Sequence, residues 1–370
     1  MLLTHETTIV LNKNDANIVG HMCYAAYKLW NVCNYERNNY KNLGLEKYPD
    51  WYDQKSKHKD DLWFKSLPSQ TAQEICKLLD KSWKSFYRLK ESGGIENPGT
   101  PRYKKDKMPI TYMQNGIQHE TGSFKVRLSL PKKLKEYMVH TYDIRAAYLY
   151  LKNPVFSNMD IIKQIKIYPP ANDGTSRILV IYEVEDVLPE EDNGHYLSID
   201  LGLHNLMTCY DNVGKTFIIG REYLSLSYFY NKEIARVQSQ WGRIQAAREM
   251  EDLKTSKHLQ KLYRKKNDCI KDYIHKMTRY ITNYCVKNDI HTVVIGDIKG
   301  IRKERNLGRK TNQKLHSLPY ARIYMQLEYK LKMKGICLIR QEESYSSQCP
   351  PQSEEVSCIY AEKRNRKKRG

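Results

Sequence analysis

The chain has 370 residues, of which 40% are apolar, so it is long enough for two or three compact domains and is not disordered by composition. Its 62 Lys and Arg residues outnumber its 42 Asp and Glu residues, and the formal charge of +20 favours a polyanionic partner over a merely soluble surface. Neither a run of 18 apolar residues nor a secretory signal is present, which disfavours membranes and leaves nucleic acid as the expected partner.

The nine cysteines exclude two common kinds of small-domain scaffold. Their number is odd and no pair is spaced as C-x-x-C, so we expect neither a disulfide framework nor a complete zinc ribbon. Reduced thiols of this kind are typical of a cytoplasmic protein.

The first part of the chain reads as a strand followed by helices. β-Branched residues predict a strand over 1–11, and apolar residues at helical spacing predict helices over 14–40 and 69–90. Asn14 or Asp15 is the expected cap of the first helix, and residues 41–61 between the helices are expected to be irregular.

Residues 103–185 read as short strands and loops, the clearest strands being 123–130, 165–168 and 177–184. We interpret this region as a small β-barrel. The first strand could join it, which would make the helical region an insertion.

An acidic, turn-rich stretch over 189–194 marks a domain boundary. The elements predicted after it are three strands, two long helices, a strand, a helix and a last strand, over 196–200, 206–210, 215–220, 225–251, 254–287, 291–298, 320–334 and 336–340. This order predicts an α/β domain of the RNase H-like class.

The sharpest local signal for chemistry is YLSID, an apolar strand that ends in Asp200. RNase H-like nucleases hold two divalent ions with several carboxylates, one of which is supplied by the first strand. A lone carboxylate at a strand end can also be a turn or cap residue, so the pattern by itself leaves both interpretations open.

Three segments of the second half, YLSIDLGLHNL, HTVVIGDIKGIRKERN and SYSSQC, resemble the TnpB family of transposon-encoded RNA-guided nucleases, which are related to type V CRISPR effectors. In the first half, LPSQTAQ, SWKSFY and PRYKK resemble the family's recognition region and the entry into its wedge domain. The resemblance implies a wedge-type β-barrel from 1–12 and 95–190, a helical recognition domain over 13–94, and a RuvC-like RNase H-fold domain over 195–370.

The resemblance also implies that the nuclease centre is incomplete. The family's first acid matches Asp200, but Gly296 stands at the place of the second, and the third would lie beyond Gly370. Asp297 is a poor substitute because adjacent strand residues point to opposite faces. The zinc ribbon is missing too, since only Cys349 remains of its first pair and Cys358 has the wrong spacing.

Glu342 and Glu343 follow the last strand and are possible substitutes for the missing acid, although ordinary solvated carboxylates would look the same. Even with one of them, a third ligand is absent. We therefore expect no bound metal and no appreciable DNA cleavage.

Basic segments with interleaved aromatic residues suit backbone tracking and base stacking, although each alone could be a solvated face. The resemblance implies that segments at these positions lie near the nucleic acid. Their residues include Arg102, Tyr103, Lys104, Lys105, Arg302, Lys303, Arg305, Arg309 and Lys310. Ser69 and Gln73 match the region that reads the motif beside the target, and Gln suits adenine.

The resemblance thus implies a guide RNA and double-stranded target DNA as partners, with no further cofactor for binding and magnesium only if cleavage is retained. Occupying the target DNA needs no bond cleavage, because the heteroduplex of guide RNA and target strand is about as stable as the DNA duplex that it replaces. We expect a nuclease-inactive repressor acting at the nucleoid of a bacterial cytoplasm. The alternatives are an active RNA-guided endonuclease with a rearranged RuvC site, and a decayed transposon remnant that binds RNA without guide preference.

Overall fold

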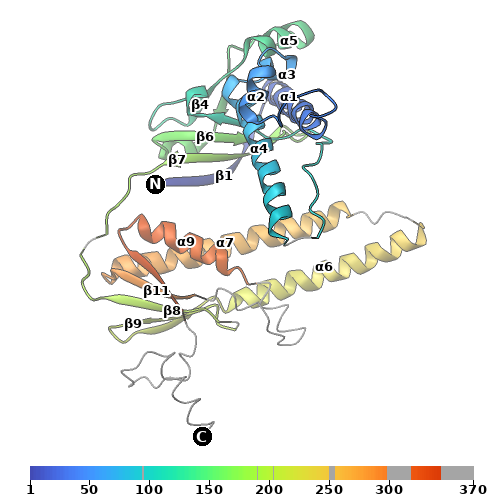
Figure 1. Cartoon of the computed structure of the whole chain (residues 1–370). Coiled ribbons are helices and arrows are strands. Elements are labelled where there is room, and N and C mark those ends of the chain that lie inside the picture. The colour runs from blue at the N-terminus through green and yellow to red at the C-terminus, as the bar shows by residue number, and fades with distance from the viewer. Residues whose placement is uncertain (94–95, 190, 203, 250–254, 298–317, 343–370) are drawn as a thin grey trace. The chain divides into compact units, whose positions relative to one another are not determined.

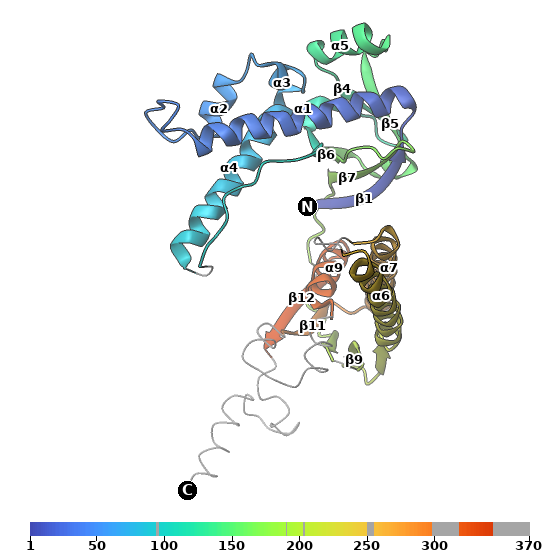
Figure 2. The same ribbon diagram turned by 90° about the vertical axis from the view of Figure 1, so that its right-hand side faces the viewer.

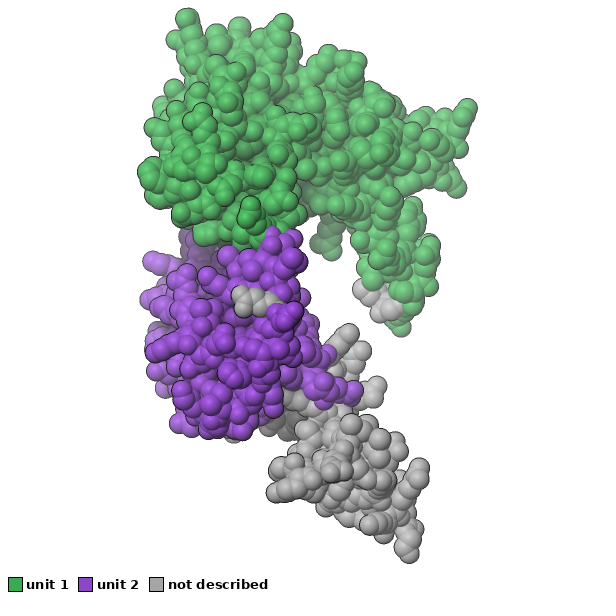
Figure 3. Space-filling view, turned by 90° about the vertical axis from the view of Figure 1, so that its left-hand side faces the viewer, with its two compact units in different colours: residues 1–185 green, residues 186–370 purple. Residues whose placement is uncertain are grey.

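The computed structural model describes residues 1–93, 96–189, 191–202, 204–249, 255–297 and 318–342. The chain forms two compact units, residues 1–185 and 186–370, which are coloured green and purple in Figure 3. Among the described helices, none is long and apolar enough to cross a membrane.

Unit 1 contains two open antiparallel sheets. The larger has the order β1-β7-β6-β2, with bounds Leu2–Val10, Thr175–Glu183, Ile161–Ile167 and Ile110–Met113. The smaller has the order β3-β4-β5, with bounds Ile117–His119, Lys125–Ser129 and Tyr148–Lys152. β1 pairs with β7 along its whole length, so the first strand does join the later ones as predicted.

The predicted barrel was wrong, because the strands described for unit 1 do not close into one. A single 3₁₀ turn, Gln114–Gly116, separates β2 from β3. Since this turn interrupts the run of strand residues, β2 pairs with β6 in one sheet while β3 pairs with β4 in the other.

The helices of unit 1 are α1 (Lys13–Asn38), α2 (Trp51–Lys57), α3 (Leu62–Lys65), α4 (Ser69–Ser92) and α5 (Lys132–Tyr142). Figure 2 shows α4 crossing α1. The apolar stripes predicted for α1 and α4 are buried and share one core with the sheets. The cap of α1 is Asn12 rather than Asn14 or Asp15: its side-chain oxygen accepts a hydrogen bond from the Asp15 backbone N–H at 2.8 Å.

Three helices, α2, α3 and α5, lie where none was predicted. α2 begins at a capping box, in which Asp50 accepts from the Tyr52 and Asp53 N–H groups and Asp53 accepts from the Asp50 N–H. α5 stands in the region expected to contain only strands and loops, and buries Leu134 and Met138 one turn apart. All three helices are short, so a few buried positions, and in α2 the capping box, specify them rather than a long periodic pattern.

Unit 2 contains a five-stranded sheet of order β10-β9-β8-β11-β12, with bounds Thr216–Ile219, Met207–Asp211, Tyr196–Asp200, Thr292–Asp297 and Cys337–Glu342. β8, β9 and β10 form an antiparallel meander, whereas β11 runs parallel to both β8 and β12. This is the topology expected from the predicted RNase H-like element order.

One face of this sheet is covered by helices. The helices of unit 2 are α6 (Glu222–Ala247), α7 (Lys257–Lys287) and α9 (Tyr320–Lys332), with α6 and α7 side by side as two long rods (Figure 1). Apolar residues of α7 and α9 form one core with Leu197, Ile199, Val293 and Ile295 of β8 and β11. Tyr196, Tyr210, Ile218 and Ile339 lie on the opposite face and are 38–48% exposed.

Candidate functional site

Asp200 is the last residue of β8 and is exposed on the sheet face that α7 and α9 leave open. The parallel register pairs Ile199 with Ile295, and Gly296 with Gln341. Because laterally paired residues of neighbouring strands point to the same face, Asp200, Gly296 and Gln341 form a row across β8, β11 and β12. This row holds one carboxylate, one glycine and one neutral amide.

The other acids at this edge of the sheet belong to the opposite face. Asp297 pairs with Glu342, one step further along β11 and β12. The structure therefore does not bring Glu342 onto the face of Asp200, from which it is also separated by the intervening strand. Glu343, Cys349 and Cys358 lie outside the described residues.

A pair of divalent ions does not fit the described part of this row. Such ions need several oxygen ligands at close range, and only Asp200 offers a carboxylate there. Among the residues that the structure describes, no group of three or more His, Cys, Asp and Glu side chains is placed to hold a metal ion.

The strand that carries Gly296 is nevertheless held firmly in place. Val293 and Ile295 are completely buried, and the Tyr324 hydroxyl of α9 donates a hydrogen bond to the Gly296 carbonyl oxygen. The strand that carries this sheet edge is thus buried and hydrogen-bonded, while the described row contains fewer acids than two-ion chemistry needs.

The predicted basic segment 101–105 lies extended along α1 and is fixed through its backbone. Asn31 donates to the Lys104 carbonyl at 2.9 Å and accepts from the Lys104 N–H at 2.8 Å, and Asn34 donates to the Pro101 carbonyl at 2.8 Å. The indole N–H of Trp30 donates to the Arg102 carbonyl at 3.2 Å. Three helix side chains therefore bind the backbone of this segment.

The side chains of the same segment are exposed, as expected of a nucleic-acid contact: Arg102, Tyr103, Lys104 and Lys105. The Lys104 ammonium lies 4.6 Å from the Trp30 ring centroid, a cation–π distance. A backbone fixed by hydrogen bonds with exposed cations suits a surface that tracks phosphates.

Ser69 and Gln73, the predicted motif readers, both lie in the first turns of α4. Ser69 is exposed and Gln73 is half-buried. The Thr71 hydroxyl donates to the Thr111 carbonyl of β2 at 2.8 Å, so this end of the helix is fixed to the sheet. Their proposed contacts with bases remain predictions, and Arg302, Lys303, Arg305, Arg309 and Lys310 lie outside the described residues.

A second basic and aromatic surface was missed from the sequence. β4 and β5 bury Val126, Leu128, Leu149 and Leu151, and present on their other face Lys125, Arg127, Tyr148, Tyr150 and Lys152. We call these five residues the β4/β5 face. The signal was present as strict alternation in KVRLS and YLYLK, which is typical of half-buried strands.

The geometry of the β4/β5 face favours both stacking and charge. Lys125 Nζ lies 3.8 Å from the Tyr150 ring centroid, and the Arg127 guanidinium carbon lies 4.3 Å from that of Tyr148. Arg127 also stands directly opposite Tyr150 in the strand register. The rings are 38–39% exposed, so they remain accessible to bases.

Residues 179–302 match the family model described as a probable transposase, OrfB_IS605. The match confirms the predicted resemblance to the TnpB family over this part of the chain. It spans β8 to β11 and therefore includes both Asp200 and Gly296.

Two solved structures are similar. One is the Cas12f1-sgRNA-target DNA complex, which matches at 15% identity over 94% of this chain and 77% of that chain, with a TM-score of 0.54. The other is a CRISPR-Cas12f ternary complex, at 15% identity over 94% and 76%, with a TM-score of 0.33. At this identity the first likeness concerns the fold alone. No curated protein matches the chain.

Proposed function

We propose that this chain binds a guide RNA and occupies matching double-stranded DNA beside a short motif without cutting it, and thereby represses transcription. The observation that carries the proposal is the row Asp200–Gly296–Gln341, in which a catalytic edge keeps its scaffold and offers a single carboxylate. The nearest described acids on β11 and β12 belong to the other face.

Binding is supported independently of cleavage. The similar solved fold is that of a protein in complex with sgRNA and target DNA, and we extend both partners to this chain as part of the proposal. The charge of +20, the exposed segment 101–105 and the β4/β5 face supply the cations and rings that such partners need. Ser69 and Gln73 are proposed to read the motif, and the basic segment over 302–310 to follow the DNA.

The proposed action is steric. Pairing between guide and target replaces one duplex by another of similar stability, so occupancy requires no bond cleavage. A protein bound at a promoter then excludes polymerase. The nucleoid would be its place of action.

A paired binding and cleavage assay tests the proposal. The chain is co-expressed with RNA from its own locus, purified as a complex, and given guide-matched duplex DNA with magnesium. We expect footprint protection of the matched DNA, none of a scrambled duplex, and no cut product. Matched DNA left unprotected would overturn guided occupancy.

An active RNA-guided endonuclease is the second candidate, favoured by the exposed carboxylate that Asp200 retains at the strand end. It predicts magnesium-dependent nicking of matched DNA that Asp200→Ala abolishes, with Glu342 and Glu343 as the next positions to mutate. A decayed remnant predicts a third outcome: steeply salt-dependent RNA binding with no preference for the guide.

A further inference from the structure

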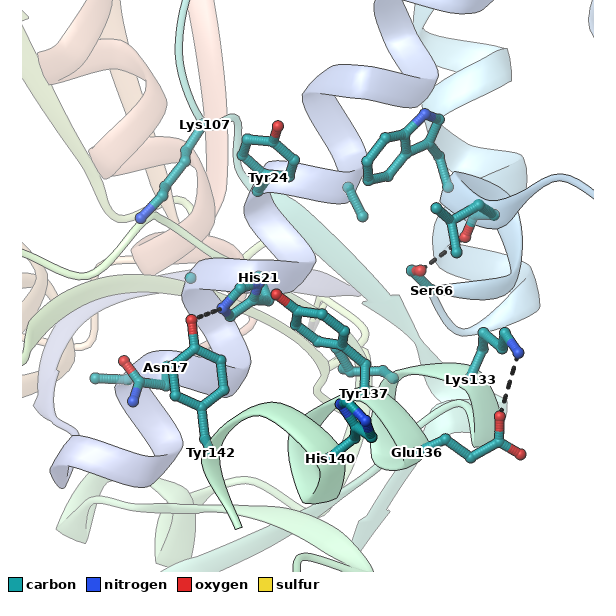
Figure 4. Close-up of a pocket in the computed structure, with 16 residues that line it drawn as sticks. Asn17, His21, Tyr24, Ser66, Lys107, Lys133, Glu136, Tyr137, His140 and Tyr142 are labelled. Atoms are coloured by element: carbon teal, nitrogen blue, oxygen red, sulfur yellow. Dashed lines mark hydrogen bonds and ion pairs between the residues drawn. The ribbon is translucent and has the colours of Figure 1, made fainter. Parts of the chain in front are cut away.

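A cavity of about 790 Å³ lies in unit 1 among α1, α3 and α5 (Figure 4). Its volume falls in the range of pockets that take whole small molecules. None of the surfaces described above includes it. The residues of its lining that matter here are His21, Tyr24, Trp63, Lys107, Tyr137 and Tyr142.

Aromatic rings form two walls of this cavity. On one side Tyr24 of α1 and Trp63 of α3 make an edge contact with centroids 5.7 Å apart. On the other, Tyr137 and Tyr142 of α5 hold His21 between them, with centroids 5.1 and 5.4 Å from its ring. The rings are thus packed against one another before any ligand arrives.

The rings are nevertheless accessible. Tyr24 is 36% exposed, and Tyr137 and Tyr142 are each 45% exposed. Figure 4 shows the Tyr137 ring with its hydroxyl end beside His21, while the Tyr142 hydroxyl is engaged with His21 Nε2 at 3.1 Å. Exposed faces on preordered rings provide a platform for a flat ligand.

The charge at the rim favours an anionic group. Lys107 lines the cavity, and no described carboxylate lies within ion-pair distance of its ammonium. Lys133, the other lysine of the lining, is paired with Glu136 at 3.4 Å. Burial, followed by the nearby Lys107 charge, lowers the pKa of His21, which keeps this ring neutral at neutral pH. A flat ring joined to an anion matches these features.

We propose that this cavity receives one unstacked nucleotide of a bound single strand, with its base between the Tyr24–Trp63 and Tyr137–Tyr142 walls and its phosphate at Lys107. The inference rests on the proposed nucleic-acid function but not on a guide or on the loss of cleavage. Aromatic stacking accepts any base, and a lysine ammonium contacts phosphate as a point charge. Guide RNA and displaced DNA could both supply such a nucleotide.

Photocrosslinking locates the base. The full chain is irradiated with short single strands that carry iodouridine in RNA or iododeoxyuridine in DNA, and the crosslinked peptides are identified by mass spectrometry. We expect adducts on Tyr24, Trp63, Tyr137 or Tyr142, and the two strands show which nucleic acid is preferred. Adducts confined to other peptides, such as the one with Tyr148 and Tyr150, or no adducts from either strand, would overturn the proposal.

Matched variants separate stacking from packing. Tyr24→Leu with Tyr137→Leu should weaken binding of the iodouridine strand about tenfold and leave binding of an abasic strand unchanged. Tyr35→Leu is the control, since Tyr35 is on α1, 55% exposed and outside the cavity lining. Equal affinity of the double variant and the wild type would refute base capture. A footprint lost while cavity adducts persist would instead refute only guided occupancy.

Discussion

The β4/β5 face of unit 1 and the open sheet face of unit 2 differ in the functional groups that they expose. On the first, cations stand over or opposite tyrosine rings, and the inward residues are fully buried. On the second, the inward residues are equally well buried, but the row at the strand ends has only one carboxylate. The two faces therefore differ in the side-chain chemistry that they expose to solvent.

The physical reason is that buried apolar residues and exposed acids contribute very differently to the stability of the fold. Leu197, Ile199, Val293 and Ile295 hold β8 and β11 against the helices, so the fold depends on them. An exposed acid at a strand end buries little surface and contributes almost nothing to stability. An acid at this sheet edge can therefore be replaced while the sheet and its register persist.

The largest expected effect tests whether the buried residues of unit 2, and not the Asp200 carboxylate, stabilise the fold. Ile295→Ala should destabilise unit 2 by about 2–5 kcal/mol, because it leaves a cavity in a closed core. Asp200→Ala should change stability by no more than about 0.5 kcal/mol. Hydrogen exchange in β8 and β11 measures both, and a comparable loss of protection from Asp200→Ala would show that the carboxylate is structural.

The next effect concerns the β4/β5 face. Lys125→Gln with Arg127→Gln should weaken binding of guide RNA about tenfold and reduce the slope of log affinity against log salt by about 2. Lys163→Gln is the matched control, because Lys163 is already paired with Glu183 at 2.7 Å in the other sheet. An unchanged salt slope in the double variant would remove this face from the interface.

Most of the elements, and the RNase H-like order of unit 2, could be predicted from periodicity, because long apolar stripes such as that of α7 leave few alternatives. α2, α3 and α5 were missed because each is short and only one or two buried residues, with a capping box in α2, specify it. The register of β11 with β12 was also beyond prediction, because it pairs residues that are far apart in the chain. It decides that Gln341 rather than Glu342 shares the face of Asp200.

A smaller effect is expected at the segment 101–105, where position matters rather than charge. Asn31→Ala removes both side-chain hydrogen bonds to the Lys104 backbone while leaving every cation in place. Losing about 1 kcal/mol of such fixation should weaken nucleic-acid binding about fivefold. Asn39→Ala is a suitable control, since the Asn39 side chain donates to the Tyr35 carbonyl at the C-terminal end of α1 and not to the segment 101–105. Fluorescence anisotropy on one labelled RNA compares the two variants. Equal affinities would show that binding does not need the Asn31 hydrogen bonds to the segment backbone.

The smallest effect should be a loss of stability of unit 1 as pH rises. Burial opposes the charge on His58, but hydrogen bonds to the Glu36 and Asp61 carboxylates outweigh it and raise the pKa of His58. A pKa that is higher in the folded state gives stability that is fully present below the unfolded value, near 6.5, and is lost as pH rises through the folded value. Unit 1 should therefore unfold at lower denaturant at pH 8 than at pH 6, and His58→Gln should flatten this difference. Hydrogen exchange resolves the two units at each pH. An equal shift in β8 and β11 would mean that the pH response is not local to the Glu36–His58 contact and would break the contrast between the two units.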